Sequence, residues 1–97
     1  MDNFTIGSKL IAEERQKQID KHGFTAEHHV NHPEWYEMDQ LSRAAVSILM
    51  PYEISLSPDN WDMEWFRNLK SRTKKERLII AGALIAAELD RLNELEK

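Results

Sequence analysis

TKKERLIIAGALIAAELDRLNEL, residues 73–95, is the stretch of the sequence that decides the fold. Thr73 followed three residues later by Glu76 is the pattern of a capping box, which marks the start of a helix. Apolar residues then recur at helical spacing and place Glu88 on the apolar side of the helix, flanked by Ala81, Leu84, Leu92 and Leu95. The sequence therefore predicts a long C-terminal helix, from about Thr73 to the C-terminus, with one carboxylate facing the core.

Two more long helices are predicted upstream. The first spans about residues 8–22, with Ser8 as its N-cap and Gly23 as the residue that ends it. The second spans about residues 33–49, and Pro33 suits its first turn. The apolar face of this second helix is expected at Leu41, Ala44, Ala45, Ile48 and Leu49.

The segments between these helices are less regular. Residues 24–32 are expected to form a polar loop that holds three of the four histidines, and residues 57–60 read as a turn. A short helix after that turn would place Trp61 and Trp65, four residues apart, on one face. We expect an all-α fold, a small bundle of three long helices plus a short one, as a single helical domain over residues 1–97.

Composition and charge narrow the class of protein. The chain has no cysteine, which excludes disulfides and cysteine-ligated metals, and its net charge of −4 argues against general nucleic-acid binding. It shows no signal-peptide pattern and no apolar run long enough to span a membrane. We therefore expect a cytoplasmic protein, and because 97 residues form only a modest core, a homo-oligomer.

Ionisable groups are expected to face the interior from all three long helices. Arg15, Gln18 and His22 occupy the centre of the apolar arc of the first helix, and Glu37 precedes Leu41 on the second. A buried lone charge costs several kcal/mol, so these groups should be paired or should meet a ligand. Two interpretations stay open. One is a core ion pair of Arg15 with Glu88 or Glu37, and the other is a polar pocket lined by Arg15, Gln18, Glu37 and Glu88.

Two further clusters could bind a ligand. His28 and His32 have helical spacing but no clear third metal ligand, so we predict no metal site, and one histidine could instead close over a ligand. Cations surround the start of the third helix, where backbone N–H groups favour an anion such as phosphate, at Lys70, Arg72, Lys74, Lys75 and Arg77. Trp61 and Trp65 could stack on a base, or could form a satellite core or an oligomer contact.

Four blocks of the sequence resemble a family of small phage and prophage proteins. They are EERQKQI at residues 13–19, HGFTAEH at residues 22–28, MDQLSRAA at residues 38–45 and LIIAGALIAAELDRL at residues 78–92. The resemblance spans nearly the whole chain. It implies a helical protein acting in the cytoplasm of a bacterial host, where small phage proteins can sequester nucleotide signals.

A looser resemblance is to the all-α NTP pyrophosphohydrolases of the MazG-like type, whose ExxE and ExxD pairs hold Mg²⁺. Here Glu37 is followed three residues on by Gln40, and Glu88 by Arg91, so no complete pair is present. Mg²⁺ needs anionic oxygen ligands, and this departure from the pattern disfavours hydrolysis.

Three functions follow as hypotheses. The first is a non-catalytic binder of a nucleotide-derived or other anionic small molecule, with no cofactor. The second is a pyrophosphohydrolase whose Mg²⁺ would be held by Glu14, Glu37, Glu88 and Asp90. The third is an inhibitor of a host protein that acts through a patch of Trp61, Trp65 and Phe66. For the first, the expected ligand-binding residues are Arg15, Gln18, His22, His28, Glu37, Trp61, Trp65, Lys74, Lys75 and Glu88.

Overall fold

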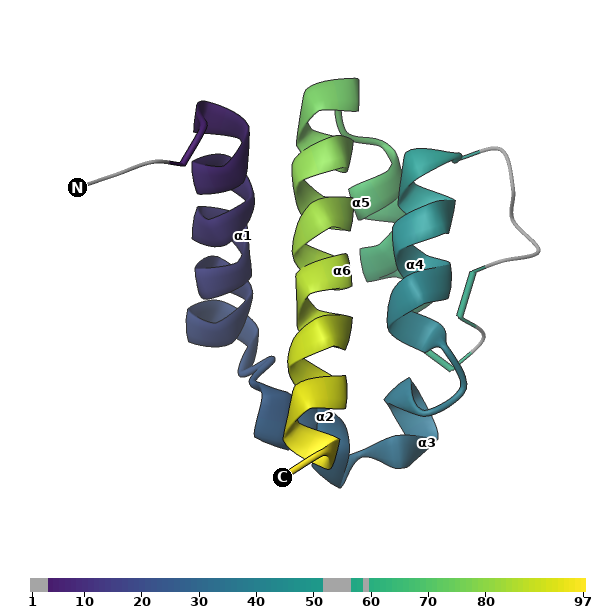
Figure 1. Cartoon of the computed structure of the whole chain (residues 1–97). Coiled ribbons are helices and arrows are strands. Elements are labelled where there is room, and N and C mark those ends of the chain that lie inside the picture. Colours follow the sequence, from purple (N-terminus) through teal and green to yellow (C-terminus); the bar gives the residue numbers. More distant parts are fainter. Residues whose placement is uncertain (1–3, 52–56, 59) are drawn as a thin grey trace.

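The computed structural model describes residues 4–51, 57–58 and 60–97. These residues form helices and no strand, which confirms the all-α class (Figure 1). The helices are α1 (Ile6–His22), α2 (Ala26–Asn31), α3 (Pro33–Tyr36), α4 (Gln40–Leu49), α5 (Met63–Lys70) and α6 (Lys74–Leu95). None of these helices is long and apolar enough to cross a membrane.

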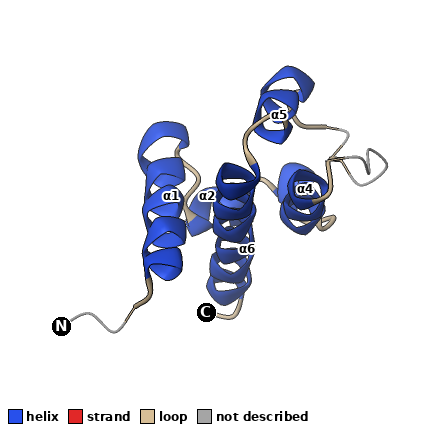
Figure 2. Cartoon of the chain, turned by 90° about the horizontal axis from the view of Figure 1, so that it is seen from above, coloured by secondary structure: helices blue, strands red, loops and turns tan. Residues whose placement is uncertain are grey.

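Helix α6 is the centre of the fold. Helices α1 and α4 lie on its two sides, and α2 and α5 also pack against it (Figures 1 and 2). The predicted capping box is confirmed, because the Thr73 side chain accepts from the Glu76 N–H and the Glu76 carboxylate accepts from the Thr73 N–H. The core around α6 consists of Tyr36, Leu41, Ala44, Ala45, Ile48, Phe66, Leu69, Ile80, Ala81, Leu84 and Ala87.

Helix α1 begins earlier than predicted. Thr5 is its N-cap and accepts a hydrogen bond from the backbone N–H of Ser8, so the assignment of Ser8 as the cap was wrong. Both residues can cap, and the sequence alone does not rank them. The other end is confirmed, because Gly23 adopts a left-handed conformation with φ of 69° and its N–H donates to the carbonyl of Ile19.

The predicted helix over residues 33–49 is in fact two helices. Pro33 does start a helix, but α3 is a single turn, and Asp39 with φ of 62° separates it from α4. Of the predicted apolar face of α4, Leu41, Ala44, Ala45 and Ile48 are buried and Leu49 is partly buried. Because the chain turns before α4, Glu37 is exposed rather than facing the core, which corrects that prediction.

The segment predicted to be a polar loop contains a helix. Residues 26–31 form α2, and the hydroxyl of Thr25 caps it by accepting from the N–H of His28. Downstream, α5 begins at Met63 after its N-cap Asp62, so Trp61 precedes the helix instead of sharing it with Trp65. The predicted turn over residues 57–60 includes residue 59, which lies outside the described residues.

The buried side of α6 also differs from the predicted one. Leu92 and Leu95 are 43% and 54% exposed, whereas Arg91 is buried. The buried stripe continues at helical spacing from Leu84 through Ala87 to Arg91. An arginine therefore occupies the interior position that a leucine was expected to fill.

Candidate functional site

Arg15 is buried and forms an ion pair, but with neither predicted partner. Its Nε donates to Oδ2 of Asp90 at 2.9 Å, and its Nη1 donates to the carbonyl of Phe24 at 2.7 Å. The Arg15 residue is 7% exposed. The Asp90 side chain is 48% exposed, so this pair lies at the edge of the core, and the predicted pairing of Arg15 with Glu88 or Glu37 was wrong.

Glu88 is paired with a residue of its own helix. Arg91 donates to both carboxylate oxygens of Glu88 at 2.8 Å, and the two side chains are only 8% and 12% exposed. The hydrogen bonds with Glu88 raise the pKa of Arg91, and the charges of Glu88, Glu37 and Asp39 act in the same direction. This fork-shaped pair keeps the guanidinium charged inside the protein.

Another polar residue, His29, is buried in the same part of the protein. It is fully buried, its ring lies 4.3 Å from that of Tyr36, and neither ring nitrogen has a hydrogen-bond partner among the described residues. Burial, together with the charges of Arg15, His28 and Arg91, lowers the pKa of His29 to about 3. His29 is therefore a neutral imidazole. We refer to Arg15, His29, Glu88, Asp90 and Arg91 as the polar core.

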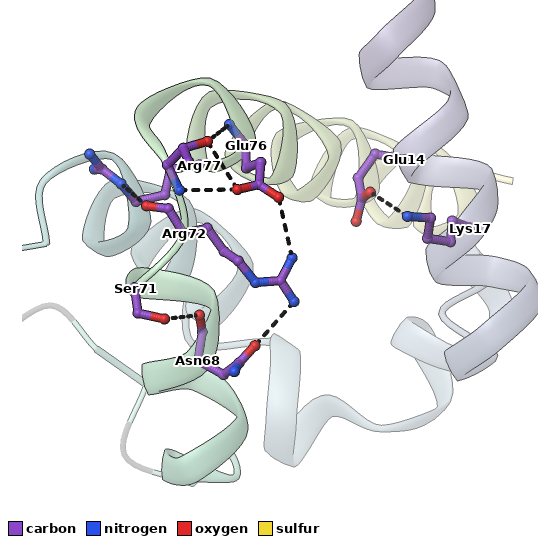
Figure 3. A network of polar contacts seen from close by, with 8 residues as sticks. Glu14, Lys17, Asn68, Ser71, Arg72, Glu76 and Arg77 are labelled. Atoms are coloured by element: carbon purple, nitrogen blue, oxygen red, sulfur yellow. Dashed lines mark hydrogen bonds and ion pairs between the residues drawn. The ribbon is translucent and has the colours of Figure 1, made fainter.

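A groove runs between α1 on one side and α5 and α6 on the other. One part of it, with a volume of about 270 Å³, has an excess of cations and is called the basic groove here. Figure 3 shows Glu14 and Lys17 on α1 opposite Arg72 and Glu76. The basic groove is lined by Glu14, Lys17, Gln18, Lys21, His22, Trp65, Asn68, Leu69, Arg72, Ile80 and Leu84.

The groove continues into a second hollow of about 290 Å³ that is more acidic. Glu14, Lys17, Arg72 and Ile80 line both hollows, so the two are continuous. The acidic hollow adds Leu10, Glu13, Glu76 and Ile79. Its ion pairs are long, with Lys17 Nζ 3.7 Å from Glu14 and Arg72 Nη1 3.8 Å from Glu76. Exposed pairs of this length contribute little to stability, so these cations can exchange partners.

A third hollow, of about 260 Å³, is aromatic. It contains all three tryptophans of the chain and is lined by Phe24, Trp35, Tyr36, Asn60, Trp61, Asp62 and Trp65. Trp61 is fixed by the hydrogen bond from its Nε1 to the carbonyl of Trp35 at 3.0 Å, and its ring lies 6.2 Å from that of Trp65. We call this hollow the aromatic pocket.

Trp65 connects the aromatic pocket with the basic groove, because it lines both. Its ring lies 6.2 Å from that of Phe24 on the pocket side and 5.8 Å from that of His22 on the groove side. Near the groove wall, Gln18 is 5% exposed, and its buried Oε1 has no hydrogen-bond partner among the described residues. An aromatic surface, cations and a free acceptor are thus contiguous.

The predicted ligand-binding residues therefore fall into separate places. Gln18, His22, Trp61 and Trp65 line the hollows described above. His22 is exposed at the end of α1, so its predicted interior position was wrong. His28 contacts the hydroxyl of Tyr36 at 3.3 Å behind the aromatic pocket. The remaining predicted residues lie elsewhere, in the polar core for Arg15 and Glu88 and on the exposed surface for Glu37, Lys74 and Lys75.

The carboxylates proposed for Mg²⁺ are not gathered at one place. Glu88 is paired with Arg91, and Asp90 with Arg15. In the described part of the chain, no three histidine, aspartate or glutamate side chains lie close enough together to hold a metal ion. The four carboxylates proposed as Mg²⁺ ligands therefore do not form one cluster.

Sequence reasoning missed several residues of these sites. Arg91 could have been found, because it lies four residues after Ala87 and seven after Leu84 on the buried stripe of α6. Trp35 and Tyr36 had no such signal, since their position depends on the break between α3 and α4. His29 was obscured by its neighbours His28 and His32, which share the helical spacing that drew attention.

Comparisons with protein-family models, curated proteins and solved structures found no match to this chain. The resemblances to small phage proteins and to MazG-like enzymes accordingly stay expectations from the sequence.

Proposed function

We propose that the protein binds a small anionic ligand with an aromatic ring, most simply a nucleotide, and holds it without converting it. The observation that carries this proposal is the position of Trp65, which belongs to both the aromatic pocket and the basic groove. A base stacked in the pocket would place its phosphates beyond Trp65, toward the cations of the groove. Stacking of a base on an aromatic side chain contributes about 1–3 kcal/mol.

The charges of the basic groove support the phosphate end of the ligand. Lys17, Lys21 and Arg72 outnumber Glu14, the single carboxylate of this groove. Arg72 is held at 3.1 Å by the side-chain oxygen of Asn68, so its guanidinium is already oriented (Figure 3). A phosphate forms charge-assisted hydrogen bonds with such donors that are roughly twice as strong as neutral ones.

Gln18 supports the proposal from the groove wall. An unpaired buried amide oxygen costs about 1–3 kcal/mol, and that cost is recovered when a donor reaches it. Because this oxygen is enclosed, a ribose hydroxyl or a base amino group would supply the donor once the Gln18 side chain turns toward the groove. Gln18 would then contribute to affinity and to selectivity over ligands without such a group.

The alternative function, inhibition of a host protein, was expected to use an exposed patch on the surface. The proposed patch of Trp61, Trp65 and Phe66 is incomplete as a surface, because Phe66 is 1% exposed and belongs to the core. The two indoles are instead walls of a hollow, which fits a small ligand better than a flat protein surface. We also propose that the protein is a homo-oligomer.

Tryptophan fluorescence provides a direct test, because every indole of the chain lines the aromatic pocket. The full-length protein would be titrated with mono-, di- and triphosphate nucleotides and cyclic dinucleotides, with nucleosides and inorganic phosphate as separate arms. We expect quenching and a rise in Tm with at least one nucleotide, weaker binding at high salt, and recovery of the ligand unchanged. If no nucleotide alters the fluorescence or the Tm, the proposal is refuted.

Two variants and a control make the test specific. Trp65→Ala removes the shared wall and should weaken binding by about 5- to 150-fold, from the loss of one stacking contact. Lys21→Glu should weaken nucleotides but not nucleosides. Lys97→Glu is the matched control, since Lys97 is exposed and lines none of the three hollows. Equal losses for Lys21→Glu and Lys97→Glu would mean that the basic groove is not the phosphate site.

A further inference from the structure

The outward side of α6 carries an exposed apolar stripe along its length. Its members recur at helical spacing and are 43–63% exposed, at Leu78, Ile85, Leu89 and Leu92. From Leu78 to Leu92 the stripe is about 21 Å long, at 1.5 Å rise per residue. Such a contiguous row on the central helix of a small domain marks a contact surface rather than scattered exposed residues.

No described helix covers this side of α6. On one flank α1 packs closely, because a Cβ added to Gly82 would lie 2.7 Å from the Cδ1 of Ile11. On the other flank Arg77 donates to the carbonyl of Ile48 in α4. Helices α2 and α5 lie on a third side of α6. The fourth side, which lies between α1 and α4 and opposite α2 and α5, is open in Figures 1 and 2. The hollows of the proposed ligand site do not include the stripe.

The two ends of the stripe are symmetric about Ile85, whereas the position that mirrors Leu89 is the buried Ala81. Leu78 and Leu92 lie seven residues on either side of it, and Lys74 and Glu96 lie eleven residues on either side. All four fall within about 20° of the direction of Ile85 around the helix axis, at 100° per residue. The apolar stripe thus ends in an exposed cation at one end and an exposed anion at the other.

We infer that this stripe is the interface of a homodimer in which the α6 helices of two copies pack antiparallel across a two-fold axis at Ile85. A two-fold contact needs a surface that is complementary to itself. In the antiparallel arrangement Leu78 meets Leu92 of the second copy, and Lys74 meets Glu96. A parallel arrangement would instead place like charges together at both ends, so the charges select the antiparallel one.

This inference deepens the proposed self-association and does not depend on ligand binding. Each copy of the dimer would form its own ligand site. Its basic groove lies between α1 and the α5–α6 region, and its aromatic pocket adjoins that groove at Trp65. The dimer would therefore bind two ligands, and a monomeric variant would keep the ligand site.

Sedimentation equilibrium of the full chain, over micromolar to hundred-micromolar concentrations, tests the interface. We expect a dimer for the unaltered protein and a monomer for Ile85→Glu, which brings two carboxylates together at the axis. Met63→Glu is the control, because Met63 is also a partly exposed apolar residue, 42% exposed, but lies on α5. A monomeric unaltered protein would refute self-association altogether, whereas a dimer that persists in Ile85→Glu would refute only this interface.

Charge exchange tests the antiparallel register without removing any apolar contact. Lys74→Glu alone and Glu96→Lys alone should each weaken the dimer by about tenfold, because each change creates two repulsive contacts across the axis. The double variant Lys74→Glu/Glu96→Lys should restore the dimer constant. If the double variant does not recover the dimer constant of the unaltered protein, the antiparallel pairing is refuted. Circular dichroism of each variant serves as the control for folding. Nucleotide titration of the Ile85→Glu monomer separates this outcome from that of the ligand proposal.

Discussion

Removal of the Glu88 carboxylate should destabilise the protein strongly, because it would leave Arg91 buried without its partner. Both side chains are nearly enclosed and share two hydrogen bonds of 2.8 Å. Breaking a buried pair from one side costs about 3–5 kcal/mol. We expect the lower end, about 3 kcal/mol, for Glu88→Ala, because Glu37 and Asp39 also act on the Arg91 charge. For a domain of this size that loss lowers Tm by roughly 12–24 °C.

The double variant Glu88→Leu/Arg91→Met separates the net contribution of the pair from the cost of an unpaired charge. Apolar residues of similar volume often replace a buried ion pair with little loss, so the double variant should be more stable than either Glu88→Ala or Arg91→Ala. Urea unfolding followed by far-ultraviolet circular dichroism measures all of these free energies. Glu94→Ala is the control, because its pair with Lys97 is solvent-exposed and should contribute under about 0.5 kcal/mol. A loss below about 1 kcal/mol in Glu88→Ala would refute the reasoning.

Three other predictions concern the packing around α6. Because the pKa of His29 is lowered to about 3 from 6.5, the unfolded chain binds more protons between these values, and the free energy of unfolding should fall as pH drops through this window. Urea unfolding from pH 7 to pH 4 should show a shallower fall for His29→Phe, by up to about 1.4 kcal/mol per pH unit, and equal slopes would contradict the assignment. Gly82→Ala should lower stability by roughly 1 kcal/mol against Ile11 despite its better helix propensity, and in an Ile11→Ala background it should instead raise stability, as thermal melts would show. Thr73→Ala removes the capping box and should cost about 1 kcal/mol, measured in the same melts, with no loss if α6 were held by packing alone.

The sequence predicted features that depend on neighbouring residues. Thr73 and Glu76 marked the start of α6, and Gly23 marked the end of α1, because caps act over one helical turn. The break at Asp39 was missed because no local signal marks it. No glycine or proline interrupts residues 37–39, and a non-glycine residue with positive φ is uncommon, although aspartate tolerates it better than most.

The candidate site was predicted only in part, because its contacts join distant segments. Gln18 was expected to face the interior from helical periodicity, and it does. The pairing of Arg15 with Asp90 spans 75 residues, and that of Trp61 with Trp35 spans 26. Periodicity within one helix shows which side chains face inward, but it does not show which residues of other helices they meet. The exposed apolar stripe of α6 was overlooked because the apolar face was taken to be the buried one.

The polar core and the proposed ligand site are connected through the chain segment between them. Helix α2 has only six residues and cannot be stable alone, so its position depends on its contacts with α6 and α3 and on the chain segment that precedes it. Arg15 holds that preceding segment through the hydrogen bond from its Nη1 to the carbonyl of Phe24, and the Phe24 side chain is a wall of the aromatic pocket. An apolar contact at that point would resist sliding of the segment less than a hydrogen bond with a fixed geometry. Arg15 therefore positions a wall of the proposed site, and we expect Arg15→Ala to lose both stability and ligand binding through this one contact.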